Sequence, residues 1–115
     1  MPEINLKLPY IATISKNKMK GFVNGHYYTQ PSYKDAVENL ANLIKLKKLK
    51  WKKEKVWIEI FFQKPQMRCD VSNLIDGMCD AIKKGIDVDD CFFSLKADWE
   101  FDKRLKPYII LKIIQ

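Results

Sequence analysis

Six aspartates gather between residues 70 and 90, and their spacing makes them the side chains of this chain best suited to do chemistry. If residues 72–84 form a helix, Asn73, Asp76 and Asp80 share one side of it, opposite an apolar side. A turn that follows this helix carries Asp87, Asp89 and Asp90. Carboxylate oxygens are the ligands that hard divalent cations such as Mg²⁺ prefer. The stretch therefore predicts a divalent cation site.

Each of these aspartates also has a purely structural explanation. Asp70 could cap the N-terminus of the predicted helix. Asp80 could pair with Lys84, which lies one helical turn further along the chain. Asp89 and Asp90 could be ordinary turn residues. The residue pattern alone leaves both explanations open for each position.

Hydrophobic periodicity predicts the elements that must position these side chains. Strands are expected near residues 4–8, 56–62, 93–101 and 108–114, helices over 32–48 and 72–84, and a basic hairpin or irregular loop over 15–31 with a turn at Asn24-Gly25. Ser32 is expected to cap the first helix. The alternation over residues 93–101 predicts a strand with one buried and one wet face. This order predicts one domain over residues 1–115 of the α/β (α+β) class, a small mixed sheet packed with two helices.

Composition restricts the kinds of protein this chain can be. Its 115 residues are 47% hydrophobic and 12% aromatic, which argues for a folded domain. No apolar run approaches the roughly 20 residues that a membrane span needs, and the N-terminus lacks a signal-peptide pattern. We therefore expect a cytoplasmic protein with no membrane contact. Three cysteines without a C-x-x-C motif, and a single histidine, argue against a zinc site and a disulfide framework.

The positive charge is concentrated in the first part of the chain. Residues 1–69 hold 14 Lys and Arg against 5 Asp and Glu, whereas residues 70–115 hold 7 against 9. A basic surface can follow a phosphate backbone, although basic chains also occur for solubility alone. The candidate DNA-binding residues are Lys16, Lys18, Lys20, Lys45, Lys48, Lys52, Lys53 and Arg68.

The acidic stretch resembles the signature of the RusA family of Holliday junction resolvases. Members of that family carry a D-x-D/S-N-L segment, a D-A-L step on the same helix and a D-D pair before the next strand. The matching segments here are Asp70-Val-Ser-Asn-Leu, Asp80-Ala-Ile, Gly85 and Asp89-Asp90. Weaker similarity outside the signature covers Leu8-Pro9, Tyr33-Lys34 and the apolar strand ahead of Asp70.

The resemblance implies a RusA-like fold and a homodimeric, Mg²⁺-dependent endonuclease, commonly encoded in prophages. Mn²⁺ is the alternative metal. Such an enzyme cuts four-way DNA junctions symmetrically. By the resemblance, Asp70 and Asp90 are the catalytic metal ligands. Asp76 and Asp80, one helical turn apart, could attract a second cation, and Asp89 is a further candidate ligand.

Two positions depart from the pattern of the family. Ser72 stands at the second acidic position of the motif, a replacement that also occurs among family members. Asp76 stands where well-studied members have a catalytic lysine, which reverses the charge there. An alternative interpretation is therefore a RusA-like protein that binds DNA junctions, or serves as a phage accessory protein, without cutting. A third is an interaction module whose acidic patch binds a basic partner.

Overall fold

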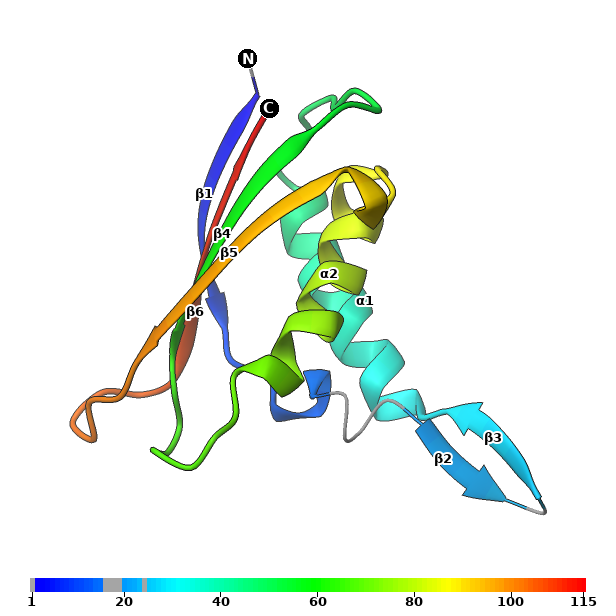
Figure 1. Cartoon of the computed structure of the whole chain (residues 1–115), viewed down its shortest axis with the longest axis vertical. Helices are drawn as coiled ribbons and strands as arrows, with labels where there is room; N and C mark the ends of the chain where they lie inside the picture. The colour runs from blue at the N-terminus through cyan, green and yellow to red at the C-terminus, as the bar shows by residue number, and fades with distance from the viewer. Residues whose placement is uncertain (1, 16–19, 24) are drawn as a thin grey trace.

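The computed structural model describes residues 2–15, 20–23 and 25–115 of the chain. Over these residues it confirms the predicted α+β class, with a mixed four-stranded sheet, two helices and a separate hairpin (Figure 1). The elements are β1 (Glu3–Pro9), the 3-10 turn η1 (Ala12–Ile14), β2 (Lys20–Val23), β3 (His26–Thr29), α1 (Pro31–Lys45), β4 (Val56–Gln63), α2 (Ser72–Ile86), the 3-10 turn η3 (Asp90–Phe92), β5 (Phe93–Glu100) and β6 (Tyr108–Ile114).

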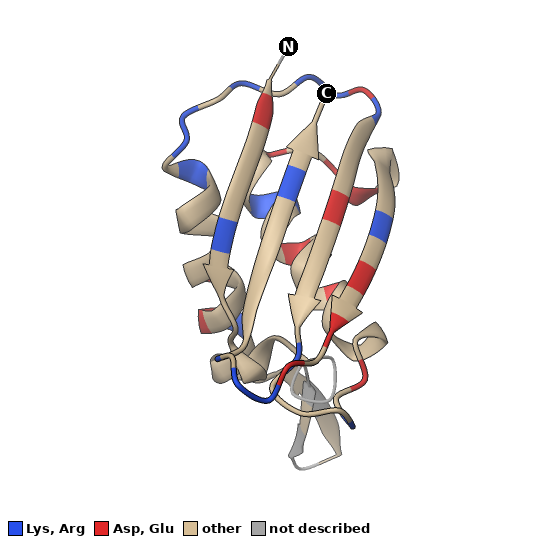
Figure 2. Ribbon diagram, turned by 90° about the vertical axis from the view of Figure 1, so that its left-hand side faces the viewer, with Lys and Arg blue, Asp and Glu red and all other residues tan. Residues whose placement is uncertain are grey.

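The main sheet has the strand order β1-β6-β4-β5. β6 runs antiparallel to both β1 and β4, whereas β5 runs parallel to β4. A parallel pair needs a crossover, and α2 supplies it between β4 and β5. Both helices cover one face of the sheet, and the other face is open to solvent (Figures 1 and 2).

The apolar side of α2 lies in the core, as its spacing predicts. Leu74, Met78, Ala81 and Ile82 are buried, while Asp76 on the opposite side is exposed. Full burial of one Leu, Ile or Met side chain contributes about 1.5–3 kcal/mol, so this side of the helix fixes its rotation on the sheet. The rotation in turn decides where the polar side chains point.

The expectation of one buried face for residues 93–101 is wrong for most of β5. Leu95 and Trp99, on the side that faces the helices, are 38% and 43% exposed. β5 is an edge strand, and the part of α2 nearest to it presents Asp76 and Asp80 instead of apolar side chains. Alternation of apolar residues thus marks the face that points inward, but the neighbouring helix determines whether that face is covered.

Two local expectations have different outcomes. The predicted hairpin is confirmed as β2 paired with β3, and Gly25 in its turn has a φ of +78°, in the left-handed region that glycine tolerates. Asn24 lies outside the described residues. The Ser32 cap is wrong: α1 begins at Pro31, with Gln30 in the cap position. Proline is favoured in the first helical turn because it lacks the N–H that would have no partner there.

Among the described residues, no helix combines the length and the apolar character needed to cross a membrane.

Gly77 allows α2 to approach the turn η1 closely. A Cβ atom at this position would lie 2.2 Å from the backbone carbonyl oxygen of Ile14. We expect Gly77→Ala to destabilise the fold by about 1–2 kcal/mol, because overpacking against backbone exceeds the ~1 kcal/mol gain in helix propensity. Urea unfolding followed by circular dichroism measures the difference. Asn39→Ala, at an exposed position of α1, is the control expected to leave stability unchanged or slightly higher; an equally stable Gly77→Ala variant would contradict the contact.

Candidate functional site

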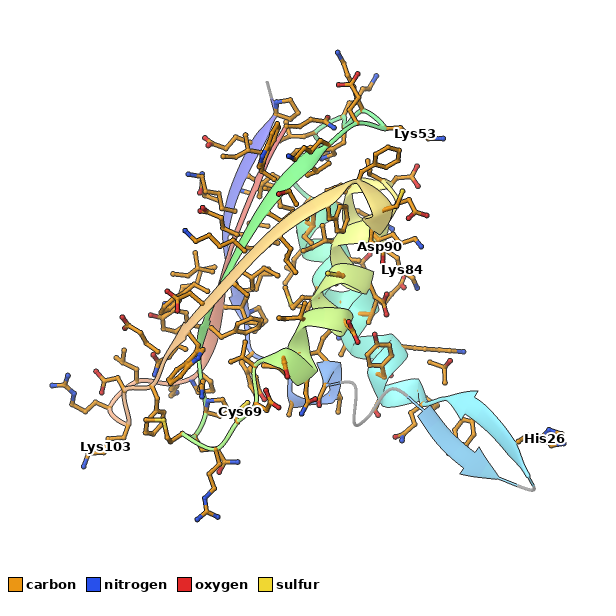
Figure 3. The ribbon with its side chains drawn as sticks, in the orientation of Figure 1. His26, Lys53, Cys69, Lys84, Asp90 and Lys103 are labelled. Carbon is orange, nitrogen blue, oxygen red and sulfur yellow. The ribbon has the colours of Figure 1, made fainter. Side chains whose placement is uncertain are left out.

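Three of the predicted aspartates line one open pocket between α2 and β5. Asp76 and Asp80 come from α2. Asp90, labelled in Figure 3, comes from η3 just before β5. The pocket has a volume of about 430 Å³, and its remaining walls are Cys79, Phe93 and Leu95. The helix α2 and the turn η3 thus contribute carboxylates from two sides of one hollow.

The pKa of the Cys79 thiol depends on its burial and on the negative charges that line this pocket. Burial raises its pKa to about 11, and the negative charges of Asp90, Asp76 and Asp80 act in the same direction. A negative potential disfavours the thiolate and favours a cation. The pocket is therefore electrostatically suited to a positive ligand.

Tyr33 of α1 holds one of the pocket carboxylates. Its hydroxyl donates a hydrogen bond to Oδ2 of Asp80, and the Tyr33 ring is buried. Burial, together with this bond and the Asp80 charge, raises the pKa of Tyr33 above its usual range. The phenol stays protonated and acts only as a donor. No local sequence pattern predicts this contact, because the two residues are 47 positions apart.

Asp89 has a structural role in the turn before β5, as one of its two interpretations predicts. Its Oδ1 accepts a hydrogen bond from the backbone N–H of Cys91, which caps η3, and its Oδ2 lies 3.7 Å from Nζ of Lys83. The bond to the Cys91 backbone lowers the pKa of Asp89, with the Lys83 charge as a smaller cause. Asp89 thus helps to hold the turn that places Asp90, and its assignment as a candidate metal ligand stays a prediction.

Asp70 lies outside this pocket. Its Oδ1 accepts hydrogen bonds from the backbone N–H and the hydroxyl of Ser72, at 3.0 and 2.7 Å, which supports the start of α2. Asp70 precedes the N-terminus of α2 and Asp90 follows its C-terminus, so the 15-residue helix places the two toward opposite ends. Their assignment as joint metal ligands stays a prediction.

The carboxylates of the pocket are the type of ligand that a hard cation prefers, although they do not surround a common point. In the described part of the chain, no three His, Cys, Asp or Glu side chains are grouped closely enough to enclose a metal. Mg²⁺ commonly uses one or two carboxylates and completes its shell with water and substrate phosphate. Two pocket carboxylates therefore suffice for a site of this kind.

The expected pairing between Asp80 and Lys84 is not the one observed. Nζ of Lys84 lies 3.3 Å from Oε2 of Glu38 on α1, and Asp80 accepts its bond from Tyr33. Lys83 and Lys84, the cations nearest to the acidic side of α2 in sequence, thus both have carboxylate partners.

The candidate basic residues fall into separate regions. Lys16 and Lys18 lie outside the described residues, and so does the side chain of Lys20. Lys45 ends α1, and Lys48, Lys52 and Lys53 are exposed in the segment 46–55, which we call the lysine loop. Arg68 is exposed in the loop before α2.

The lysine loop and Asp90 lie at the same end of the sheet, where β4 and β5 both begin. The loop leads into Val56 and η3 leads into Phe93, and these two residues are partners in the parallel register of β4 and β5. Figure 3 shows Lys53 and Asp90 toward the same end of the molecule. Gln115 fixes the loop, since its side-chain amide accepts from the N–H of Lys52 and donates to its carbonyl, both at 2.7 Å. Sequence reasoning missed this role of the terminal glutamine.

Lys64 is a second residue that the sequence did not reveal. It is 6% exposed, its Nζ donates to the carbonyl of Met67 at 3.1 Å, and it lies 3.5 Å from the ring centroid of Trp99. A cation over an aromatic face is attracted by the ring quadrupole. Lys64 thereby ties the loop that carries Arg68 and Asp70 to β5.

No model of a known protein family matches the chain, and no characterised protein sequence matches it significantly.

The reactivity of Cys79 tests the charge of the pocket. With a pKa of about 11, its thiol is almost fully protonated at pH 9, so alkylation by iodoacetamide should be slow. Asp90→Asn removes one of the charges that raise this pKa, and we expect it to accelerate alkylation of Cys79 several-fold at pH 9. Peptide mass spectrometry separates this thiol from Cys69 and Cys91. Asp87→Asn, at an exposed left-handed position that asparagine tolerates, is the matched control; equal rates in the two variants would contradict the assignment.

The link between α1 and α2 can be tested through stability. Tyr33→Phe keeps the buried ring and removes the donor to Asp80, so we expect the free energy of unfolding to fall by about 1 kcal/mol. Tyr28→Phe removes a hydroxyl from a ring that is 45% exposed and should change stability by less than about 0.5 kcal/mol. Urea denaturation of both variants makes the comparison, and equal effects would show that the bond contributes nothing.

Proposed function

We propose that this protein is a Mg²⁺-dependent, structure-specific DNA endonuclease that acts on four-way junctions as a homodimer, with Mn²⁺ as an alternative metal. The observation that carries the proposal is the pocket shared by Asp76, Asp80 and Asp90 beside the lysine loop. A carboxylate pocket next to a basic segment can combine a cation site with phosphate binding. The RusA-like acidic motif supports the same function.

The roles of the residues follow from their positions. Asp90 and Asp80 are proposed to hold the cation, with Asp76 as a further ligand on the same wall, while Tyr33 keeps Asp80 in place. A bound Mg²⁺ supplies Lewis-acid polarisation of the scissile phosphate and a more acidic bound water. Exposed lysines of the lysine loop, and Arg68, are proposed to neutralise neighbouring phosphates. The catalytic role of Asp70 rests on the motif alone.

One observation favours the alternative of a junction-binding protein without nuclease activity. Asp76 lines the pocket at the position of the family lysine, so a negative charge replaces a group that would oppose the charge of the phosphate. Lys83 and Lys84 are paired with Asp89 and Glu38, so they are not preset to replace it. A nicking assay on a synthetic four-way junction decides between binding and cutting.

Neutral replacements of the two catalytic candidates test the proposal. Asp70→Asn keeps Oδ1 as an acceptor for Ser72, removes the charge and replaces Oδ2 by an amide nitrogen. Asp90→Asn makes the same change in the pocket. We expect each to reduce Mg²⁺-dependent nicking of a synthetic four-way junction by about 100-fold or more, with junction binding retained or strengthened. Asp87→Asn, outside the pocket, should cut normally.

The substrates for this assay are a four-way junction, a fork and plain duplex, each with and without Mg²⁺. Nicks specific to branched DNA support the enzyme, whereas a mobility shift without nicks, with Mg²⁺ or Mn²⁺, identifies a binder. Unchanged cleavage by Asp90→Asn would refute the pocket as the metal site. Absence of both junction binding and calorimetric Mg²⁺ binding would favour the interaction module.

A further inference from the structure

The face of the main sheet that points away from the helices is open, and its strands carry residues of both charge signs (Figure 2). Alternate residues of all four strands form it. Five of its apolar side chains are Trp57 and Phe61 of β4 and Tyr108, Ile110 and Ile114 of β6. Trp57 and Ile110 are 48% and 41% exposed, and the other three are half-buried. Apolar side chains clustered on one exposed face indicate an interaction site more strongly than scattered ones do.

The apolar side chains are arranged around a charged row. Glu59 in β4 lies directly between Lys112 of β6 and Lys96 of β5 in the strand register. Two hollows of about 410 and 280 Å³ flank this row, one beside Trp57 and Ile114 and the other beside Phe61 and Ile110. The surface is thus a polar ridge between two partly apolar hollows.

The charges of this face balance, although the chain carries +7. Lys7, Lys96 and Lys112 lie on the strands of the face, and Lys55 lies over the ring of Trp57. They are matched by Glu3, Glu59, Asp98 and Glu100. A face with no net charge does not attract a phosphate backbone. It also does not repel its own copy, as the basic parts of this chain would.

We infer that the open sheet face binds a second copy of this chain in a two-fold, sheet-on-sheet contact. In a two-fold contact the same patch serves on both copies, so the patch must complement itself. A two-fold axis placed between the ridge and one hollow sets the ridge of each copy into the hollow of the other. Glu59 and the lysines beside it then supply both charge signs to both sides of the contact. Sheets stack in this way about 10 Å apart.

The contact leaves the candidate active site accessible. The pocket of Asp76, Asp80 and Asp90 lies on the helix side of β5, away from the open face. This inference rests in part on the proposed function, because symmetric cutting of a junction needs two copies. It assigns the surface that joins them, on evidence independent of the metal and the DNA.

The mass of the protein in solution tests the contact. Analytical ultracentrifugation without DNA or Mg²⁺ should give twice the 13.6 kDa of one chain at micromolar concentration. Ile110→Glu places an unpaired charge in the contact and should weaken dimerisation by about 100-fold or more. Leu105→Glu, in the loop before β6 with the native side chain 50% exposed, is the matched control and should remain dimeric. Trp57→Gln provides a second variant, and thermal unfolding of each variant verifies that it is folded.

Three results would overturn the inference. One is a monomer at all concentrations up to about 100 µM. Another is a dimer unaffected by both Ile110→Glu and Trp57→Gln. The third is a monomer whose junction binding is weakened by Lys112→Gln, which would identify DNA as the occupant of the face. Since the masses are measured without DNA or metal, the dimer can be verified in a protein that does not cut, and cleavage by a monomer would refute only the dimer.

Discussion

The parallel pairing of β4 and β5 is the constraint on which the rest of the structure depends. Two parallel neighbours require a crossover, so α2 must return over the sheet before β5 can begin. The apolar side of the helix packs on the sheet, and its acidic side is left facing the edge strand. Because the two strands are parallel, both begin at the same end of the sheet, and the lysine loop before β4 therefore lies near Asp90 before β5.

The carboxylates of the pocket reduce the stability of α2. Asp76 and Asp80 are one helical turn apart, and like charges at this spacing destabilise a helix by about 0.2–0.5 kcal/mol. The fold limits this cost by leaving the pocket open to water and by giving Asp80 a donor from α1. The thiol of Cys79 adds no charge because the same carboxylates help keep it protonated. A bound cation would relieve the remaining repulsion, which is why such a cluster suits a ligand site better than a core.

The sequence predicted most of the fold and part of the site, for physical reasons that differ between elements. The sidedness of α2 was predictable because a 3.6-residue period records which side chains are buried. The exposure of Leu95 and Trp99 was not, because it depends on which side of a distant helix lies above β5. Asp70 and Asp90 share one motif, yet the length of α2 separates them in space. The bond of Tyr33 to Asp80 joins two helices, and no local pattern encodes such a contact.

The positive excess of the chain lies away from the open face of the sheet. The excess of lysine lies in loops, where long cations are well hydrated and can reach a phosphate backbone, whereas the strands of the open face alternate both signs. Had the excess been spread evenly, two copies would repel each other at any face they shared. Concentrating it in the lysine loop leaves the sheet neutral enough to pair with itself. The positive charge of the lysine loop therefore does not oppose the association proposed for the open face, and it stays available for the proposed contact with DNA.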